Sequence, residues 1–526
     1  MRRSYRYSLV VLVAVLFSAG VLFYVLADDK VTIDRWDWID RPPRIQPDYS
    51  QTVVPPNIAA LNFLVAEKGT HYCVKIYSKQ NPTIEVFSRK SKIVIPEKRW
   101  HELLNNNNGQ QLYFDVFVQK QNNHWLRFKT IANTIAAEKI DNYIAYRRIY
   151  PVHSFWNKIG IYQRNLHNYD ERPILKNDGF ETGCLNCHTF CNNRTDKMLI
   201  GIRSAEYGSS TLLIEDGQVN KIGTKTGYSC WHPSGRMAVY SVNKVRQFYH
   251  TARNEVRDVL DLDSLLAYYI VDDKVIKTTP VLSQKKRLET YPTWSPDGRY
   301  LYFCSAAMLW SDQNKLPPDF HDEVRYDLVR VSYDLDSDRW GKTETVLSSD
   351  NTGLSILEPR ISPDGRWLLF CMCDYGCFPV YQKNSDLYLM DLEAAAKTGR
   401  YDYRRLDINS DHSESWHTWS SNSRWIAFSS KRHNGVFTRI YLSYVDRNGR
   451  VYKPILMPQK DPTLYDHCLD AFNTPEFTVD AVQAAGEKLA RAVRGSEKIT
   501  VEMPITMATP AAGQTPPAEP WFQERE

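Results

Sequence analysis

The stretch Trp294–Ser305, WSPDGRYLYFCS, places a turn signal directly before a run of apolar and aromatic residues. In Pro296-Asp297-Gly298, proline presets φ, aspartate hydrogen-bonds locally and glycine accepts a positive φ. The residues that follow, Tyr300 to Phe303, are of types that favour strands. The stretch therefore predicts a strand end, a tight turn and a strong strand.

The same pattern occurs at three other places in the chain. WHPSGRMAVYS begins at Trp231, ISPDGRWLLFCM at Ile361 and WSSNSRWIAFSS at Trp419. A second strand-like segment follows in each unit, and a degenerate earlier unit starts at Arg194. Repeated units of this kind are typical of β-propeller blades, in which short sheets pack radially. We expect a propeller over residues 194–477, with a further blade closed by residues near either end of that range.

The W-S-P-D-G-R-x-L-x-F signature at Trp294–Phe303, degraded in the other copies, resembles the TolB-type propeller repeat. This resemblance implies a mainly β protein with a TolB-like propeller, usually of six blades. It implies no particular activity, because such propellers occur in scaffolds, enzymes and binding proteins.

The rest of the chain divides by composition. Residues 30–56 are rich in proline and predict a linker without regular structure. Residues 57–150 show period-two alternation, as in Leu112, Phe114, Val116 and Val118, and predict a small β-sandwich-like domain. Residues 151–193 predict an irregular connecting segment. Residues 478–495 predict a short helix, and residues 496–526 a disordered tail.

The N-terminus predicts export. Arg2, Arg3 and Arg6 precede an uncharged run, Tyr7–Ala27. At about 1.5 Å per residue, this run is long enough to cross a hydrocarbon core of roughly 30 Å. The flanking charge places the body of the protein outside the cytoplasm. We expect residues 1–29 to be an uncleaved transmembrane signal anchor, with the protein on the periplasmic side of the bacterial inner membrane. Cleavage after Val25-Leu26-Ala27 is the alternative.

Charge and missing motifs exclude several functions. The chain carries 66 basic and 61 acidic side chains, a net charge of +5 that does not indicate a nucleic-acid partner. It has no G-x-S-x-G elbow and no glycine-rich phosphate loop. A serine hydrolase domain and a nucleotide-binding loop are therefore not expected.

One short motif indicates a cofactor. Residues 184–188 read C-x-x-C-H, the attachment signal for c-type haem. In this interpretation Cys184 and Cys187 form thioether bonds to one covalent haem c, and His188 is the proximal iron ligand. The motif resembles that of c-type cytochromes, although the helices that normally flank it in that family are not evident here.

Two other interpretations of the motif remain open, since Cys191 follows closely. Cys184, Cys187, His188 and Cys191 could ligate zinc, or Cys191 could form a disulfide with Cys184 or Cys187. A second cluster, Cys371, Cys373 and Cys377, favours a disulfide from Cys377 to one of the other two, because Cys371 and Cys373 share one face of a strand.

The sixth iron ligand has three candidates, His232, His250 and Met198, each with an ordinary structural alternative. The sequence thus predicts an exported, anchored haem protein that transfers electrons with a redox partner protein or a cell-envelope complex. A cell-envelope scaffold or binding propeller, in which the haem or a disulfide is structural, is the main alternative. A haem enzyme with an open coordination position is a third.

Overall fold

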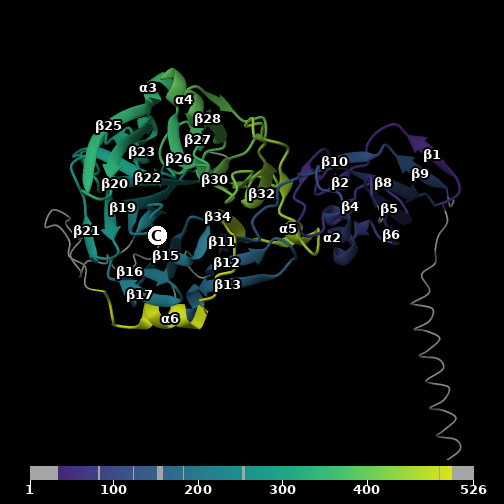
Figure 1. Ribbon diagram of the computed structural model, residues 1–526, viewed down its shortest axis with the longest axis horizontal. Coiled ribbons are helices and arrows are strands. Elements are labelled where there is room, and N and C mark those ends of the chain that lie inside the picture. Colours follow the sequence, from purple (N-terminus) through teal and green to yellow (C-terminus); the bar gives the residue numbers. More distant parts are fainter. Residues whose placement is uncertain are drawn as a thin grey trace, which may run out of the picture.

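The computed structural model describes residues 33–80, 83–121, 124–150, 158–181, 183–224, 226–250, 255–484 and 486–499. These residues are mainly β and form two parts, a large ring of sheets and a smaller N-terminal part beside it (Figure 1). No helix among them is long and apolar enough to cross a membrane. The predicted anchor at Tyr7–Ala27 and the predicted tail beyond residue 499 lie outside the described residues.

The N-terminal part contains a seven-stranded sheet, a three-stranded sheet and one helix. The large sheet comprises β1 (Trp36–Ile39), β3 (Val53–Val54), β5 (His71–Tyr77), β6 (Ile84–Ser88), β8 (Gln111–Gln119), β9 (Trp125–Phe128) and β10 (Ile131–Ile135). The small sheet comprises β2 (Ile45–Gln46), β4 (Phe63–Val65) and β7 (Lys92–Ile93), and the helix is α2 (Glu97–Asn105).

The strand pattern expected in this region occurs on β8, at the centre of the large sheet. Leu112, Phe114, Val116 and Val118 are fully buried in one core. The expected linker was wrong, because the proline-rich segment 30–56 contains the short strands β1, β2 and β3. Residues 97–105 form α2, which the sequence pattern did not predict, and its Trp100 donates to the Ile58 carbonyl at 3.0 Å.

The ring consists of six sheets of four antiparallel strands. They are β34-β11-β12-β13, β14-β15-β16-β17, β18-β19-β20-β21, β22-β23-β24-β25, β26-β27-β28-β29 and β30-β31-β32-β33. A single bridge, Ser264 to Leu288, joins the third and fourth sheets. The arrangement is propeller-like.

The bounds of these strands follow the chain. They are β11 (Tyr143–Ile149), β12 (Ile159–Asn165), β13 (Glu171–Lys176), β14 (Gly183–Cys191), β15 (Arg194–Ser204), β16 (Gly208–Glu215), β17 (Gln218–Ile222), β18 (Gly227–Trp231), β19 (Met237–Tyr249), β20 (Arg257–Ile270), β21 (Val275–Lys277), β22 (Arg287–Trp294), β23 (Tyr300–Ala307), β24 (Asp327–Asp334), β25 (Arg339–Leu347), β26 (Ser355–Ile361), β27 (Trp367–Cys373), β28 (Asp386–Asp391), β29 (Tyr403–Arg405), β30 (Glu414–Trp419), β31 (Trp425–Ser430), β32 (Arg439–Tyr444), β33 (Ile455–Leu456) and β34 (Ala471–Thr478).

The repeated turn lies where the sequence predicts it, between the first and second strands of four sheets. The amide of Gly298 donates to the Ser295 carbonyl at 2.8 Å, and Gly298 has a φ of 72°. Gly235, Gly365 and Ser423 make the equivalent bond and also have positive φ values. The expectation of one turn motif used in every such unit is confirmed.

The ring begins earlier than expected. Strand β11 belongs to the first sheet, not to the N-terminal part, and the segment 151–193 contains β12, β13 and β14 instead of irregular structure. Buried polar residues interrupt the alternation of apolar and polar residues that would predict β12 from the sequence. Gln163 bonds the backbone of Val482, and Arg164 donates to Gln459 and to the Pro458 carbonyl. Polar residues can occupy these buried positions because they have hydrogen-bond partners inside the protein. The strand therefore lacks apolar alternation.

Residues from the C-terminal end close the ring, since β34 pairs with β11 as the fourth strand of the first sheet. The remaining elements are short. They are α3 (Ser349–Thr352), α4 (Leu392–Thr398), α5 (Leu464–His467), α6 (Gly486–Arg494), η1 (Asn177–Phe180), η2 (His321–Glu323) and η3 (Pro379–Tyr381). Helix α6 falls within residues 478–495, where the sequence indicates a helix, and packs against β13 and β17.

Candidate functional site

Six strands, one from each sheet, surround the axis of the ring. Strands β14, β18, β22, β26, β30 and β34 contact one another in that order, and β34 contacts β14 in turn. In each of these strands the pairing with the neighbouring strand is interrupted by a β-bulge at an equivalent place. The bulge lies at Cys187 in β14, for example, and at Glu358 in β26. Four of these bulges hold a residue other than glycine at positive φ, namely Tyr291, Glu358, Trp416 and Thr474, with φ from 48° to 53°. Such bulges re-aim side chains and often border functional sites.

The six inner strands line a central cavity of about 600 Å³. Its walls are aromatic and charged. They include His188, Phe190, Tyr228, Trp231, Trp294, Glu358, Arg360, Trp416, His417, Trp419 and Glu476. Aromatic side chains together with convergent polar groups are a usual character of a ligand site.

His188 of the C-x-x-C-H motif lies on this wall. It is 7% exposed, and neither ring nitrogen makes a hydrogen bond of ordinary length and angle, although the backbone of Thr474 lies close enough to interact with the ring. Burial, reinforced by the positive charge of Arg147 and opposed by the backbone of Thr474, lowers the pKa of His188 to about 3. The imidazole is therefore neutral at physiological pH, which is the form that ligates a metal.

The cysteines of the motif lie on an extended strand, not on a turn. Cys184 is buried, its Sγ is 3.9 Å from Arg203 Nη2, and it does not line the cavity. The side chain of Cys187 lies outside the described parts of the protein. At about 3.3 Å per residue, the Cα atoms of Cys184 and Cys187 are about 10 Å apart. Thus His188 fits the role of an iron ligand, whereas attachment of one haem through both cysteines requires β14 to bend away from β15 near Cys184.

The same extended strand opposes the two other interpretations of the motif. Cys191 is at the far end of β14, about 23 Å along the strand from Cys184 and about 13 Å from Cys187. A disulfide needs Cα atoms within about 7 Å. Cys184 and Cys191 are both free, and Cys191 Sγ instead lies 3.9 Å from the carbonyl oxygen of His232.

None of the three candidates for the sixth iron ligand presents a free donor to the cavity. His232 uses both ring nitrogens, with Ser234 Oγ at 2.7 Å and the Gly298 carbonyl at 3.2 Å. His250 lies in a different cavity and contacts Asp258 at 3.1 Å. Met198 is fully buried in the core that contains Phe190.

The expected disulfide in the second cysteine cluster is wrong, because Cys371, Cys373 and Cys377 are all free. Two of the thiols have a polar neighbour instead. Cys371 Sγ lies 3.6 Å from Glu358 Oε2, and Cys373 Sγ lies 3.4 Å from the Tyr375 carbonyl.

Sequence reasoning missed the cavity residues Glu358, His417 and Glu476. A signal exists for Glu358 and His417, since each lies a few residues before a repeated turn, at the bulge of an inner strand. Glu476 has no such signal, because β34 pairs with β11 from the start of the ring. Burial raises the pKa of Glu358 and of Glu476 to about 7. Glu476 accepts from the amide of Phe190 at 2.8 Å and so fixes β14 beside His188.

No protein-family model and no curated protein matches this sequence. Several solved structures are similar over part of it. A puromycin-hydrolysing peptidase of Mycobacterium tuberculosis gives a TM-score of 0.32 at 14% identity, over 52% of this chain and 38% of that one. Hydrazine synthase of Kuenenia stuttgartiensis gives 0.31 at 14%, over 50% and 64%. An oligogalacturonate lyase of Vibrio parahaemolyticus gives 0.34 at 10%, over 78% and 100%. The chain covers less than two thirds of the first two structures, and likenesses this weak carry no argument about function.

Proposed function

We propose that this protein is a c-type haem protein of the bacterial cell envelope, with a TolB-like six-bladed propeller and an N-terminal membrane anchor, that exchanges electrons with a partner protein. Its single haem c is attached at Cys184 and Cys187, with His188 as iron ligand. The observation that carries the proposal is His188 itself: it belongs to a C-x-x-C-H motif, lines the central cavity, and has two buried ring nitrogens without a hydrogen bond of ordinary geometry.

A buried polar atom without a partner costs about 1–3 kcal/mol, so both nitrogens of His188 are expected to have partners in the working protein. Iron on one ring nitrogen satisfies one of them. Haem supplies reversible one-electron oxidation and reduction. The protein's own residues hold the ligand: Glu476 fixes the neighbouring backbone of Phe190, and burial keeps the imidazole of His188 neutral.

A specific observation also favours the second candidate function, a cell-envelope scaffold or binding propeller. Strand β14 holds Cys184 outside the cavity. In a scaffold, β14 would keep this extended form and the cysteines would serve only the structure.

A redox titration of the purified full chain, followed by exposure of the reduced protein to carbon monoxide, tests the role. Reversible reduction without carbon monoxide binding is the result expected for electron transfer, because the iron then offers no open coordination position. Rapid binding indicates a haem enzyme or sensor, and a protein that carries no reducible group is a scaffold. Either of these results overturns electron transfer.

His188→Ala supplies a spectroscopic check on ligation. The reduced spectrum of this variant is expected to change and to recover when imidazole is added, because free imidazole takes the vacated place. His412→Ala is the matched control, since His412 lies outside the cavity lining and its replacement leaves the spectrum as in the wild type.

A further inference from the structure

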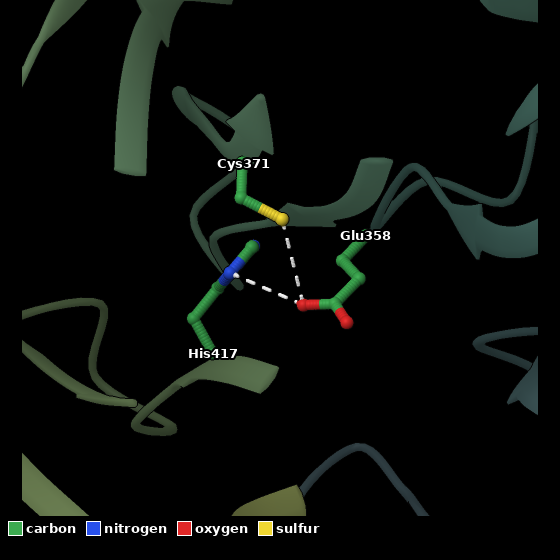
Figure 2. Close-up of side chains that lie close together, drawn as sticks. All are labelled: Glu358, Cys371 and His417. Atoms are coloured by element: carbon green, nitrogen blue, oxygen red, sulfur yellow. Dashed lines mark hydrogen bonds and ion pairs between the residues drawn. The ribbon is translucent and has the colours of Figure 1, made fainter. Parts of the chain in front are cut away.

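A second group of potential ligands meets in the wall of the central cavity, away from the C-x-x-C-H motif. Glu358 on β26, Cys371 on β27 and His417 on β30 direct their side chains toward one another (Figure 2). The carboxylate, thiol and imidazole atoms lie within 4.8 Å of one another, and all three residues are at most 3% exposed.

Local backbone irregularities bring two of these side chains inward. Glu358 has a φ of 53°, and the residue before His417, Trp416, has a φ of 50°. Both belong to the bulges of their inner strands. Non-glycine residues in this region cost of order 1–3 kcal/mol each, and such strain is concentrated at functional sites. Cys371 comes from the regular strand β27, where it pairs with Leu357, the residue before Glu358.

The hydrogen bond of His417 determines which of its nitrogens is free. Nε2 lies 3.1 Å from the carbonyl oxygen of Leu369, and a carbonyl only accepts, so Nε2 carries the proton. Nδ1 is then a bare lone pair. It makes no hydrogen bond of ordinary geometry within the described residues, although the backbone of Glu358 also lies near the ring, and it is 4.0 Å from Glu358 Oε2. An unprotonated nitrogen and a carboxyl oxygen thus lie close together without a hydrogen bond between them.

The carboxylate is also incompletely bonded. Glu358 Oε2 accepts from the Trp416 amide at 2.5 Å and lies 3.6 Å from Cys371 Sγ, whereas Oε1 has no partner in the described structure. Arg360, the nearest basic residue of the same strand, directs its Nη1 to the carbonyls of Pro292 and Pro359 instead.

We propose that Glu358, Cys371 and His417 bind one zinc ion, through a carboxylate oxygen, the thiolate sulfur and Nδ1. In a tetrahedral site with zinc–ligand bonds of about 2.0–2.3 Å, the ligand atoms lie roughly 3.5 Å apart. The observed separations of 3.6 Å from sulfur to oxygen and 4.0 Å from nitrogen to oxygen are close to this value. The bond from Nε2 to Leu369 is the outer contact that usually orients a ligating histidine.

Charge balance supports a divalent ion at this place. A thiolate and a carboxylate together neutralise zinc, so the loaded site buries no net charge. The mixture of sulfur, nitrogen and oxygen donors suits zinc better than magnesium or calcium, which prefer oxygen alone.

The fourth position opens into the cavity. Glu358 and His417 line the cavity, whereas Cys371 lies behind them. Three protein ligands with one exchangeable position are the arrangement of zinc sites that bind water or a substrate, not of closed structural sites. The ion would hold a water molecule or a small anion facing the cavity. The proposal does not depend on the haem.

Metal analysis of the full-length protein after exposure to zinc and removal of the excess tests this proposal. Wild type is expected to retain one zinc per chain, and Cys371→Ser and His417→Gln to bind zinc at least tenfold more weakly. Cys373→Ser is the matched control, because it removes a buried thiol two residues along the same strand that bonds the Tyr375 carbonyl, and it is expected to retain the metal.

Two further measurements keep the test decisive if a variant misfolds. Cobalt bound to the wild type is expected to give the absorption of a thiolate–metal bond. A wild type that binds neither zinc nor cobalt, or in which Cys371 is found in a disulfide by mass analysis of the unreduced protein, overturns the proposal. Equal loss of zinc from Cys371→Ser and Cys373→Ser, both folded, also overturns it.

Discussion

Glu289 on β22 shows how strongly burial inside the ring shifts the pKa of a single carboxyl group. The residue is fully buried, Oε2 lies 3.4 Å from the Gln284 amide, and Oε1 has no partner in the described structure. Burial raises the pKa of Glu289 to about 8. An acid whose pKa is raised on folding stabilises the protein below its unfolded pKa, and this contribution is lost as the pH rises through the folded value.

We therefore expect Glu289→Gln to match the wild type at pH 4 and to become more stable than the wild type as the pH rises. Between pH 5 and pH 8 the difference in unfolding free energy should grow by on the order of 4 kcal/mol, at about 1.4 kcal/mol per pH unit. Urea unfolding of both proteins at several pH values measures it. A difference that stays constant with pH would contradict the assigned pKa. Glu344→Gln, which removes an exposed carboxylate, is the control for the loss of one negative charge.

At the scale of elements, the last strand of the ring is the most informative. Phe477 on β34 is fully buried in the largest core, although it lies more than 300 residues from its pairing partner Ile144 on β11. The strand links the end of the ring to its beginning.

Phe477→Ala is expected to lower the unfolding free energy by about 3–5 kcal/mol, the usual loss for a buried phenylalanine. Val436→Ala, at a side chain that is 63% exposed, should change it little. Denaturant unfolding compares the two variants with the wild type. An effect as small for Phe477→Ala as for Val436→Ala would mean that β34 does not close the ring.

Elements determined by local chemistry could be predicted from the sequence, whereas elements held by distant residues could not. The turn at Gly298 could be predicted because its chemistry is local: proline, aspartate and glycine each have a fixed conformational preference. Strand β12 could not, because Gln163 and Arg164 are satisfied by residues near 459 and 482. For the same reason the cluster of Glu358, Cys371 and His417 was not foreseen, since three separate strands supply it.

At the scale of the whole molecule, the ring explains why the C-x-x-C-H motif lacks the flanking helices of cytochromes. Here the motif is part of an inner strand, and His188 lines the cavity at the centre of the six sheets. The Phe190 amide donates to Glu476, which lies 286 residues later in the chain, so the environment of the histidine forms only when the ring is closed.

The central claim, covalent haem at this strand, is tested most directly by a haem-stained denaturing gel and the intact mass of the full chain, made together with cytochrome c maturation proteins. We predict a mass increased by one haem in the wild type and in Cys73→Ala, a buried cysteine of the N-terminal part. The double variant Cys184→Ala/Cys187→Ala should carry no covalent haem. A wild-type chain of unmodified mass that does not stain would contradict the claim and leave the scaffold or binding propeller as the remaining proposal.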